Sequence, residues 1–323
     1  MYTKILSRLS FYYFLVLLKS LNVIVTLSDA NFTNYNNDFK HSTEFRDKIA
    51  KQVIKNGWAI LPSVLDISLI DQLRREEFPP LLKTRMEAGG PDRGPGRYYL
   101  TPPFEKGWSD ERLIAQPDIL DVVSKIVGKD AVLCQLGVDT PLGRGESEFQ
   151  EIHRDCGPLF DDEDYEEPPS YQLAVNFPLL DVLPAKRGSY KDLGPLEIHK
   201  GSHRITVKEG ASMIELGKVD LEPVYMKAGD ALIRDVRVLH RGTPNFGPNP
   251  RPVGVIGYSI KWLRRPEVGI SVTKEYLQRA SPKVQSLLRF EGIVDEIKEY
   301  TGQERYGAET LKETSGGSFS SEL

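Results

Sequence analysis

Short apolar runs separated by Gly, Pro and Asp fill the chain between residues 131 and 262. Runs of this length that are bounded by turn-forming residues are typical of β-strands. The run at 171–178 is the most apolar, and a second run at 253–262 is rich in β-branched and aromatic residues. Several short strands in succession favour a sandwich or a jelly roll, so we expect a mainly β fold in this region.

Helical spacing of apolar residues is found on both sides of the predicted strands. Residues 43–56 read as an amphipathic helix that ends at Gly57, and residues 67–75 read as a second helix. A short strand is expected between them, at 58–61. The stretch 273–299 also has helical spacing, although Pro and Gly interrupt it. We therefore expect helices that flank the strands and buttress them.

The pattern divides the chain into four parts. Residues 1–30 carry cations before an apolar run and end in small residues, which predicts a signal peptide or an N-terminal hydrophobic segment. A lysine within that run argues against a stable membrane span. Residues 42–265 are expected to form the main domain, 266–310 a C-terminal helical extension, and 311–323 a flexible tail. The expected location is the secretory pathway if the first segment is a signal, and otherwise the cytoplasm.

Composition narrows the class of protein. The chain has 323 residues, of which 40% are hydrophobic and 27% charged, and this is an ordinary balance for a globular enzyme. The net charge of -4 provides no basic stripe for nucleic acid, so no nucleic-acid partner is expected. Two cysteines, Cys134 and Cys156, exclude a disulfide framework but leave one bridge open.

The candidate metal ligands are the His-x-Asp pair His153 and Asp155, together with the distant His240. Side chains at positions i and i+2 of a strand project from one face, whereas on a helix they diverge by about 200°. The pair can therefore chelate one ion if residues 150–156 are extended. Two histidines and one carboxylate, with the other positions open, suit non-haem Fe(II). Taken alone, the pair is a weak signal, and the simpler interpretation is that His-x-Asp occurs by chance and His240 is an ordinary polar residue near a turn.

The residues around His240 predict a hairpin that carries an arginine. An apolar run leads from Gly229-Asp230 to His240, and a loop rich in Pro, Gly and Asn occupies 242–250. A β-rich run follows from Arg251. If the two runs pair, Arg251 lies close to His240 across the ladder. Its guanidinium can then hold a carboxylate through two parallel hydrogen bonds, which suits a dicarboxylate co-substrate that also chelates the metal.

Four motifs, taken in order, carry a resemblance to a known family. They are His-Arg-Asp at 153–155, Gly-Pro-Leu-Glu-Ile-His-Lys-Gly-Ser-His at 194–203, Gly229-Asp230, and His-Arg-Gly-Thr-Pro-Asn at 240–245 with Arg251 after it. Across roughly residues 50 to 265 the chain resembles the phytanoyl-CoA dioxygenase family, and four ordered motifs are far more specific than any one of them. One departure is His199, where relatives often have an apolar residue or proline.

The resemblance implies a fold, a cofactor set and a reaction. The fold would be a double-stranded β-helix, a jelly-roll, cupin-like barrel with flanking helices. The cofactors would be Fe(II), 2-oxoglutarate and O2, with ascorbate as a candidate reductant. By this match His153, Asp155 and His240 would be the iron ligands, and Arg251 would hold the distal carboxylate of 2-oxoglutarate. We expect hydroxylation or a related oxidation of a small organic substrate, because Asp155 stands where related halogenases have a small residue.

Two buried amides are further candidates for the co-substrate pocket. Asn176 interrupts the apolar run 171–178, and Gln135 lies in an earlier one. A buried amide needs a hydrogen-bonding partner, and neighbouring backbone is the simpler choice. The resemblance makes 2-oxoglutarate the alternative. His203 could also approach the metal, but a structural hydrogen bond after a Gly-Ser turn is the expectation.

Two loops are candidates for contact with a substrate. The Gly- and Pro-rich stretch 89–99 carries cations and aromatic residues, and it could reach over an active-site mouth or be a plain surface loop. The acidic run 161–167 is expected to be a solvated loop, with a lid that favours cationic substrates as the alternative.

Two other classes of protein remain open. One is a hydrolytic or isomerising metalloenzyme on the same barrel, with zinc in place of iron. The other is a non-catalytic binding domain with a relic site. Metal analysis and an assay for 2-oxoglutarate consumption separate the three. The identity of the primary substrate and the oligomeric state do not follow from the sequence, because fold kinship does not transfer specificity.

Overall fold

The computed structural model describes residues 39–157, 159, 169–263 and 270–304. The chain divides into two units, and all the described residues belong to the second, Phe39–Leu323. The predicted signal segment 1–30, the acidic run 161–167 and the tail 311–323 lie outside the described residues.

The first described helix, α2 (Thr43–Asn56), has the predicted bounds. The side chain of Ser42 caps its start by accepting a hydrogen bond from the backbone N–H of Phe45. Gly57 ends it in the left-handed conformation, at φ 84°, and donates to the carbonyl of Val53. The helix therefore ends at the glycine that the sequence pattern singled out, and its start is set by the Ser42 cap.

The second predicted helix, 67–75, is longer than expected. α3 (Ile67–Gln72) continues through one π-helical turn, η1 (Leu73–Glu77), into α4 (Phe78–Ala88). The remaining helices are short, namely η2 (Lys106–Ser109), α5 (Glu111–Ile114), α6 (Pro117–Val127), η4 (Ser202–Arg204), α7 (Val207–Glu215), α8 (Lys274–Arg279) and α9 (Pro282–Leu287). Among the described residues, no helix has the length and apolar character that crossing a bilayer requires.

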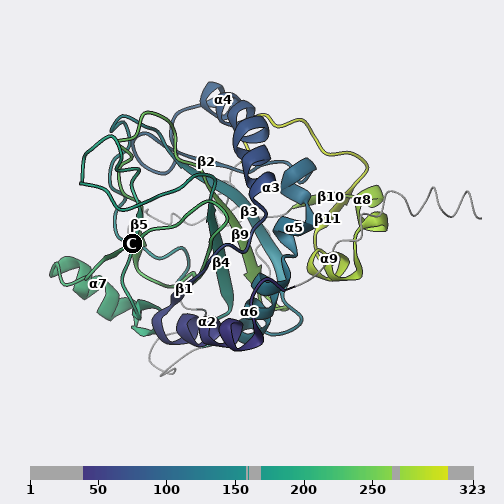
Figure 1. The fold of residues 1–323 in the computed structure, drawn as a ribbon, viewed down its shortest axis with the longest axis horizontal. Helices are drawn as coiled ribbons and strands as arrows, with labels where there is room; N and C mark the ends of the chain where they lie inside the picture. Colours follow the sequence, from purple (N-terminus) through teal and green to yellow (C-terminus); the bar gives the residue numbers. More distant parts are fainter. Residues whose placement is uncertain (1–38, 158, 160–168, 264–269, 305–323) are drawn as a thin grey trace, which may run out of the picture. The chain divides into compact units, whose positions relative to one another are not determined.

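Six antiparallel strands form the main sheet, in the order β1-β7-β4-β9-β3-β2. Their bounds are β1 (Trp58–Leu61), β2 (Arg97–Leu100), β3 (Val132–Pro141), β4 (Gln172–Pro178), β7 (Ala231–Asp235) and β9 (Val253–Ser259). Helices α2 and α6 contact each other, and α6 also contacts β4 and β9, so this pair lies against the sheet (Figure 1). The predicted mainly β fold with flanking helices is confirmed.

The two faces of the main sheet differ in chemistry. In β4 the odd-numbered residues Leu173, Val175 and Phe177 belong to the large apolar core that the helices share. The alternate residue Asn176 points to the opposite face, because successive strand side chains alternate. In β7 the same alternation buries Ile233 in the apolar core and turns Arg234 to the face of Asn176. One face is therefore apolar, and the other carries polar groups.

A smaller sheet contains the strand that begins at His240. It contains β6 (Glu222–Val224), β5 (Leu196–Ile198) and β8 (His240–Arg241), in that order. Near the C-terminal end, β10 (Ser271–Thr273) and β11 (Gly292–Val294) form a parallel pair. Within the described ranges, the main and smaller sheets stay separate and do not close into a barrel.

Three local predictions are wrong. The runs before His240 and after Arg251 do not form a hairpin, since β4 lies between β7 and β9 and pairs with both. Residues 150–156 are not a regular strand, because only His153 forms an isolated bridge. The stretch 89–99 is not all loop, since β2 begins at Arg97 and pairs with β3.

The stretch 273–299 also differs from the expected helix. It folds as α8 and α9, and its last part includes the strand β11. The physical reason lies in its breakers, since α9 begins at Pro282 and β11 at Gly292.

Candidate metal centre

A pair of backbone hydrogen bonds brings His153 and His240 face to face. The N–H of each residue donates to the carbonyl of the other at 3.0 Å, which makes an isolated antiparallel bridge. The two imidazole rings lie with centroids 4.4 Å apart. Residues 87 positions apart in the sequence thus become neighbours through their backbones, and their side chains share one side of the bridge.

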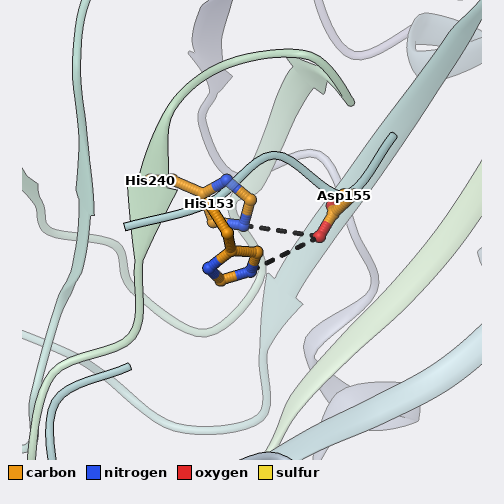
Figure 2. A group of neighbouring side chains, drawn as sticks. All are labelled: His153, Asp155 and His240. Atoms are coloured by element: carbon orange, nitrogen blue, oxygen red, sulfur yellow. Dashed lines mark ion pairs between the residues drawn. The ribbon is translucent and has the colours of Figure 1, made fainter. Parts of the chain in front are cut away.

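Asp155 is held against the strand segment that leads to His240. Its N–H donates to the carbonyl of Val236 at 3.0 Å. Figure 2 shows the carboxylate turned towards both imidazoles. One oxygen, Oδ1, lies 3.5 Å from Nε2 of His240 and 3.9 Å from Nε2 of His153. The i and i+2 residues of His-x-Asp therefore converge, although an isolated bridge and not a regular strand holds them.

The three groups satisfy the geometric requirement of a metal site. One ligand atom from each residue lies within 4.8 Å of the other two. The backbone fixes which imidazole nitrogen faces this point, because Nδ1 of His153 donates to the carbonyl of Glu151 at 2.8 Å. Nδ1 of His240 donates in the same way to the carbonyl of Val238 at 3.0 Å. A proton on each Nδ1 leaves the Nε2 lone pairs for a metal.

The electrostatics of the site favour the protonation states that bind metal. Burial lowers the pKa of His153 to about 4, and neighbouring His240 acts in the same direction. Burial alone would raise the pKa of Asp155, but Arg234, followed by His240, outweighs it and holds that pKa well below its ordinary value. At neutral pH His153 is therefore a neutral donor and Asp155 an anion, the forms in which both can coordinate a cation.

Arg251 is buried, and its guanidinium contacts the segment that precedes β5. Its Nε donates to the carbonyl of Leu193 at 3.2 Å and its Nη2 donates to that of Gly194 at 2.8 Å. A Cβ on Gly194 would stand 2.5 Å from the carbonyl oxygen of Pro244, so this glycine lets the two loops touch. Burial lowers the pKa of Arg251 to about 10, and nearby Arg97 acts in the same direction, which still leaves the group protonated at neutral pH.

The charge of Arg251 has a consequence for ligand binding. Among the described residues, no carboxylate lies within ion-pair distance of its guanidinium, whose recorded acceptors are two carbonyls. Arg97, by contrast, forms an ion pair with Asp139 at 2.7 Å. A buried guanidinium without a counter-ion is unfavourable, so Arg251 is suited to an anionic ligand.

Asn176 contacts a residue that the sequence did not single out. Its Oδ1 accepts a hydrogen bond of 3.0 Å from Nε of Arg234, and Nη2 of Arg234 donates to Oδ2 of Asp155. Asn176 is thus connected to the candidate metal carboxylate through one guanidinium. The expected hydrogen bond to neighbouring backbone is not the one that the structure records.

Gln135 lies in a second polar contact on the same face. Its Nε2 donates to the hydroxyl of Tyr99 at 2.7 Å. Gly137 makes room for this arrangement, since a Cβ there would stand 2.1 Å from the Tyr99 hydroxyl. Burial raises the pKa of Tyr99 to about 12, so the phenol is neutral at neutral pH. No contact between Gln135 and the three candidate ligands is recorded among the described residues.

His203 has the structural role that was expected of it. Its Nε2 donates to the carbonyl of Ile54 at 3.0 Å, which ties the η4 turn to the end of α2. It is absent from the cluster of candidate ligands found in the described part of the chain.

The sequence missed Arg234 and Tyr99. Arg234 lies in β7, directly after an apolar run, and Tyr99 lies in a stretch that was read as a loop. A signal for Arg234 was present, because a charged residue in the middle of a buried strand needs a partner. The sequence does not show that this partner is Asp155, which lies 79 positions away.

Comparison with known structures identifies the fold. AviO1 from Streptomyces viridochromogenes Tue57 matches with a TM-score of 0.52 and 19% identity, over 70% of this chain and 99% of that one. EvdMO1 matches with a TM-score of 0.52 and 19% identity, over 67% of this chain and 50% of that one. HygX from Streptomyces hygroscopicus was crystallised with nickel, 2-oxoglutarate and hygromycin B bound. It matches with a TM-score of 0.50 and 16% identity, over 77% of this chain and 97% of that one.

These similarities confirm the predicted jelly-roll class of fold, with the qualification that the described sheets do not form a closed barrel. The model of the family described as phytanoyl-CoA dioxygenase matches residues 103–253. That segment contains His153, Asp155, His240 and Arg251. Residues 103–253 of this chain are thus similar to the phytanoyl-CoA dioxygenase family, in agreement with the resemblance carried by the four motifs.

Proposed function

We propose that this chain is an Fe(II)- and 2-oxoglutarate-dependent dioxygenase that hydroxylates, or otherwise oxidises, a small organic substrate. The observation that carries the proposal is the convergence of two Nε2 atoms and one carboxylate oxygen within 4.8 Å. That convergence lies inside the segment that matches the family. Two histidines and one carboxylate are the donor set of non-haem Fe(II) oxygenases.

The donor set fits such a metal in chemistry as well as in number. His153 and His240 each use Nδ1 for a backbone carbonyl, so each has Nε2 left to face a metal. Asp155 offers Oδ1 as an anionic donor. Fe(II), together with 2-oxoglutarate and O2, supplies oxidation of a C–H bond with release of succinate and CO2. His153, Asp155 and His240 would hold the metal through three protein atoms, which would leave room for the co-substrate and O2 to bind it as well.

Arg251 is the proposed partner of the distal carboxylate of 2-oxoglutarate. Its guanidinium is cationic at neutral pH, buried, and oriented by two carbonyls from residues 193 and 194. A fixed guanidinium binds a carboxylate with little loss of side-chain entropy. The binding energy of the remote carboxylate can then align the reacting end of the co-substrate.

Asn176 and Gln135 are proposed as secondary contacts for the co-substrate. Both lie on the polar face of the main sheet, and both are already hydrogen-bonded within the protein. Asn176 is the stronger of the two proposals, because its partner Arg234 also contacts the candidate metal ligand Asp155. The nickel and 2-oxoglutarate in the HygX structure are in keeping with the proposed cofactors.

Asp155 bears on the class of reaction that the site would support. A carboxylate at this position occupies the place that a halide needs in a halogenase, so we propose hydroxylation or a related oxidation. The substrate is proposed to be a small molecule. Hydrolysis or isomerisation with zinc, and a relic site that only binds ligand, are the competing functions.

A single assay separates these functions. The purified protein, incubated with Fe(II), 2-oxoglutarate, ascorbate and O2, is expected to form succinate, and faster with a true substrate than without one. A panel of small molecules followed by succinate release would then find that substrate. Metal-dependent turnover of a candidate substrate without consumption of 2-oxoglutarate would favour the hydrolytic or isomerising enzyme. Binding of ligands with no turnover of any kind would favour the relic site.

A further inference from the structure

Arg234 follows three apolar residues in β7 and precedes Asp235, and its side chain is only 6% exposed. Its neighbours Ile233 and Asp235 point to the other face of the sheet, where Asp235 pairs with Arg237. Across the ladder Arg234 lies opposite Ala174, whose small side chain leaves space for the guanidinium. Burial of a charged side chain in this position is unfavourable unless its contacts compensate for the lost water.

Those contacts connect two of the proposed active-site residues. Nη2 of Arg234 donates to Oδ2 of Asp155, and Nε donates to Oδ1 of Asn176 at 3.0 Å. Its Nη1 is buried and has no hydrogen-bonding partner among the described residues. The planar guanidinium thus spans two acceptors at once, which the single ammonium of a lysine could do only with a different geometry.

The contact with Asp155 separates the roles of the two carboxylate oxygens. Oδ2 is occupied by Arg234, whereas Oδ1 faces Nε2 of His240 at 3.5 Å and Nε2 of His153 at 3.9 Å. A carboxylate held in this way offers one oxygen to a metal. The second oxygen is occupied by the guanidinium and would not be available to the metal.

The contact with Asn176 fixes the direction of its amide. Arginine can only donate hydrogen bonds, so the atom that faces Nε of Arg234 must be the amide oxygen. The NH2 group of Asn176 then points away from the guanidinium, and it is left as a donor. A carboxylate or carbonyl oxygen of a ligand is the complementary acceptor.

We propose that Arg234 is a positioning residue with two effects: it limits Asp155 to one metal bond, and it directs the NH2 group of Asn176 at the co-substrate. The inference rests on the proposed function and deepens it. Its consequence is specific, because loss of Arg234 weakens the binding of 2-oxoglutarate while the affinity for metal is retained. A residue that only stabilised the fold would weaken both.

The test uses Arg234→Met and Arg234→Lys in the full chain, with Co(II) as a redox-stable metal probe. Titration calorimetry gives the Co(II) affinity, and the visible spectrum of bound Co(II) reports its coordination. In Arg234→Met, Asp155 can offer both oxygens, so we expect an altered Co(II) spectrum and a Co(II) Kd at most threefold higher than that of the parent. The Kd for 2-oxoglutarate of the Co(II) form should rise at least tenfold, about 1.4 kcal/mol. Arg234→Lys keeps the charge and should give an intermediate rise; it carries the test if Arg234→Met does not fold.

Arg46→Lys is a matched control. Arg46 is also buried and ion-paired, to Asp121 at 2.6 Å, but it lies on α2. Its substitution should lower thermal stability and leave both the Co(II) spectrum and the 2-oxoglutarate affinity unchanged. A double-mutant cycle adds a second readout: on an Asn176→Ala background, Arg234→Lys should raise the Kd for 2-oxoglutarate less than it does alone, because the two residues act together.

Three results would overturn the inference. The first is an unchanged Co(II) spectrum with a 2-oxoglutarate Kd within threefold of the parent. The second is a loss of Co(II) affinity as large as the loss of 2-oxoglutarate affinity, which would assign Arg234 a purely structural role. The third is full additivity with Asn176→Ala. If the parent itself binds Co(II) but no 2-oxoglutarate, the proposed function fails instead, and the Co(II) spectra of parent and variants still decide the effect on Asp155.

Discussion

Replacing Arg251 with alanine should weaken the binding of 2-oxoglutarate far more than it weakens the binding of metal. The guanidinium is buried and fixed by the carbonyls of Leu193 and Gly194, so it can meet a carboxylate without rearrangement. Hydrogen bonds to charged groups contribute roughly 1.5–3 kcal/mol each, and loss of one partner leaves a desolvated charge. We expect a total loss of about 3–4 kcal/mol, which raises the Kd roughly 150- to 900-fold.

Arg251→Lys refines the same prediction. Lysine keeps the positive charge but has neither the planar fork nor the two carbonyl contacts that orient the guanidinium. It should recover about half of the lost binding free energy, so its Kd should lie between those of the parent and Arg251→Ala. The assay is titration calorimetry of 2-oxoglutarate into the Ni(II)-loaded protein, because nickel holds the co-substrate without turnover.

Pyruvate is the matched ligand, since it has the chelating 2-oxo acid but no distal carboxylate. The parent should bind pyruvate weakly, and Arg251→Ala should bind it no worse than the parent does. Equal affinity of parent and Arg251→Ala for 2-oxoglutarate would refute the role of Arg251. An equal loss of affinity for both ligands would show that the substitution damages the site as a whole.

The remaining predictions concern stability. Gly137→Ala should destabilise the protein by about 1–3 kcal/mol in chemical denaturation, because the new Cβ meets the hydroxyl of Tyr99 at 2.1 Å; an unchanged midpoint would contradict the packing. Gly57→Ala should lower Tm, since φ is 84° and the Cβ meets neighbouring side chains; a stabilised variant would contradict this. Burial would raise the pKa of Asp235, but the hydrogen bonds and charge of Arg237 outweigh it and lower that pKa in the folded protein. The ion pair therefore stabilises the fold at pH values above 3.8, the ordinary pKa of the carboxyl group, and this stabilisation is lost as pH falls below that value. In Asp235→Asn, Tm should therefore fall less steeply than in the parent as pH is lowered through the acid range. An equally steep fall in both proteins would contradict the role of the Asp235–Arg237 ion pair.

The sequence singled out His153 and Asp155 as candidate ligands because their signal is short-range, and the structure places both beside His240. His153 and Asp155 are two residues apart, and any backbone that places both side chains on one side makes them converge. The reason given for Arg251 was wrong, although the residue remains a good candidate. A hairpin is the simplest pairing of two successive strands, but β4 is inserted between β7 and β9, and such a crossover leaves no local trace in the sequence.

Arg234 illustrates what a single sequence cannot provide. The run 231–235 reads as buried strand, and the structure confirms that each of its residues is buried. Periodicity assigns Arg234 to a face of the sheet but not to a partner. Its partners Asp155 and Asn176 come from two separate segments, 79 and 58 positions away, and only the register of β4 and β7 brings them together.

The measurement that tests the central claim most directly is succinate formation from 2-oxoglutarate by the Fe(II)-loaded protein and its single variants. The account predicts turnover by the parent, and by the control His41→Ala, whose imidazole contacts the carbonyl of Pro62. It predicts no turnover by His153→Ala, Asp155→Ala or His240→Ala. Parental activity in any of these three would remove that residue from the ligand set, and absence of turnover in a folded, iron-loaded parent with a broad substrate panel would contradict the dioxygenase function itself.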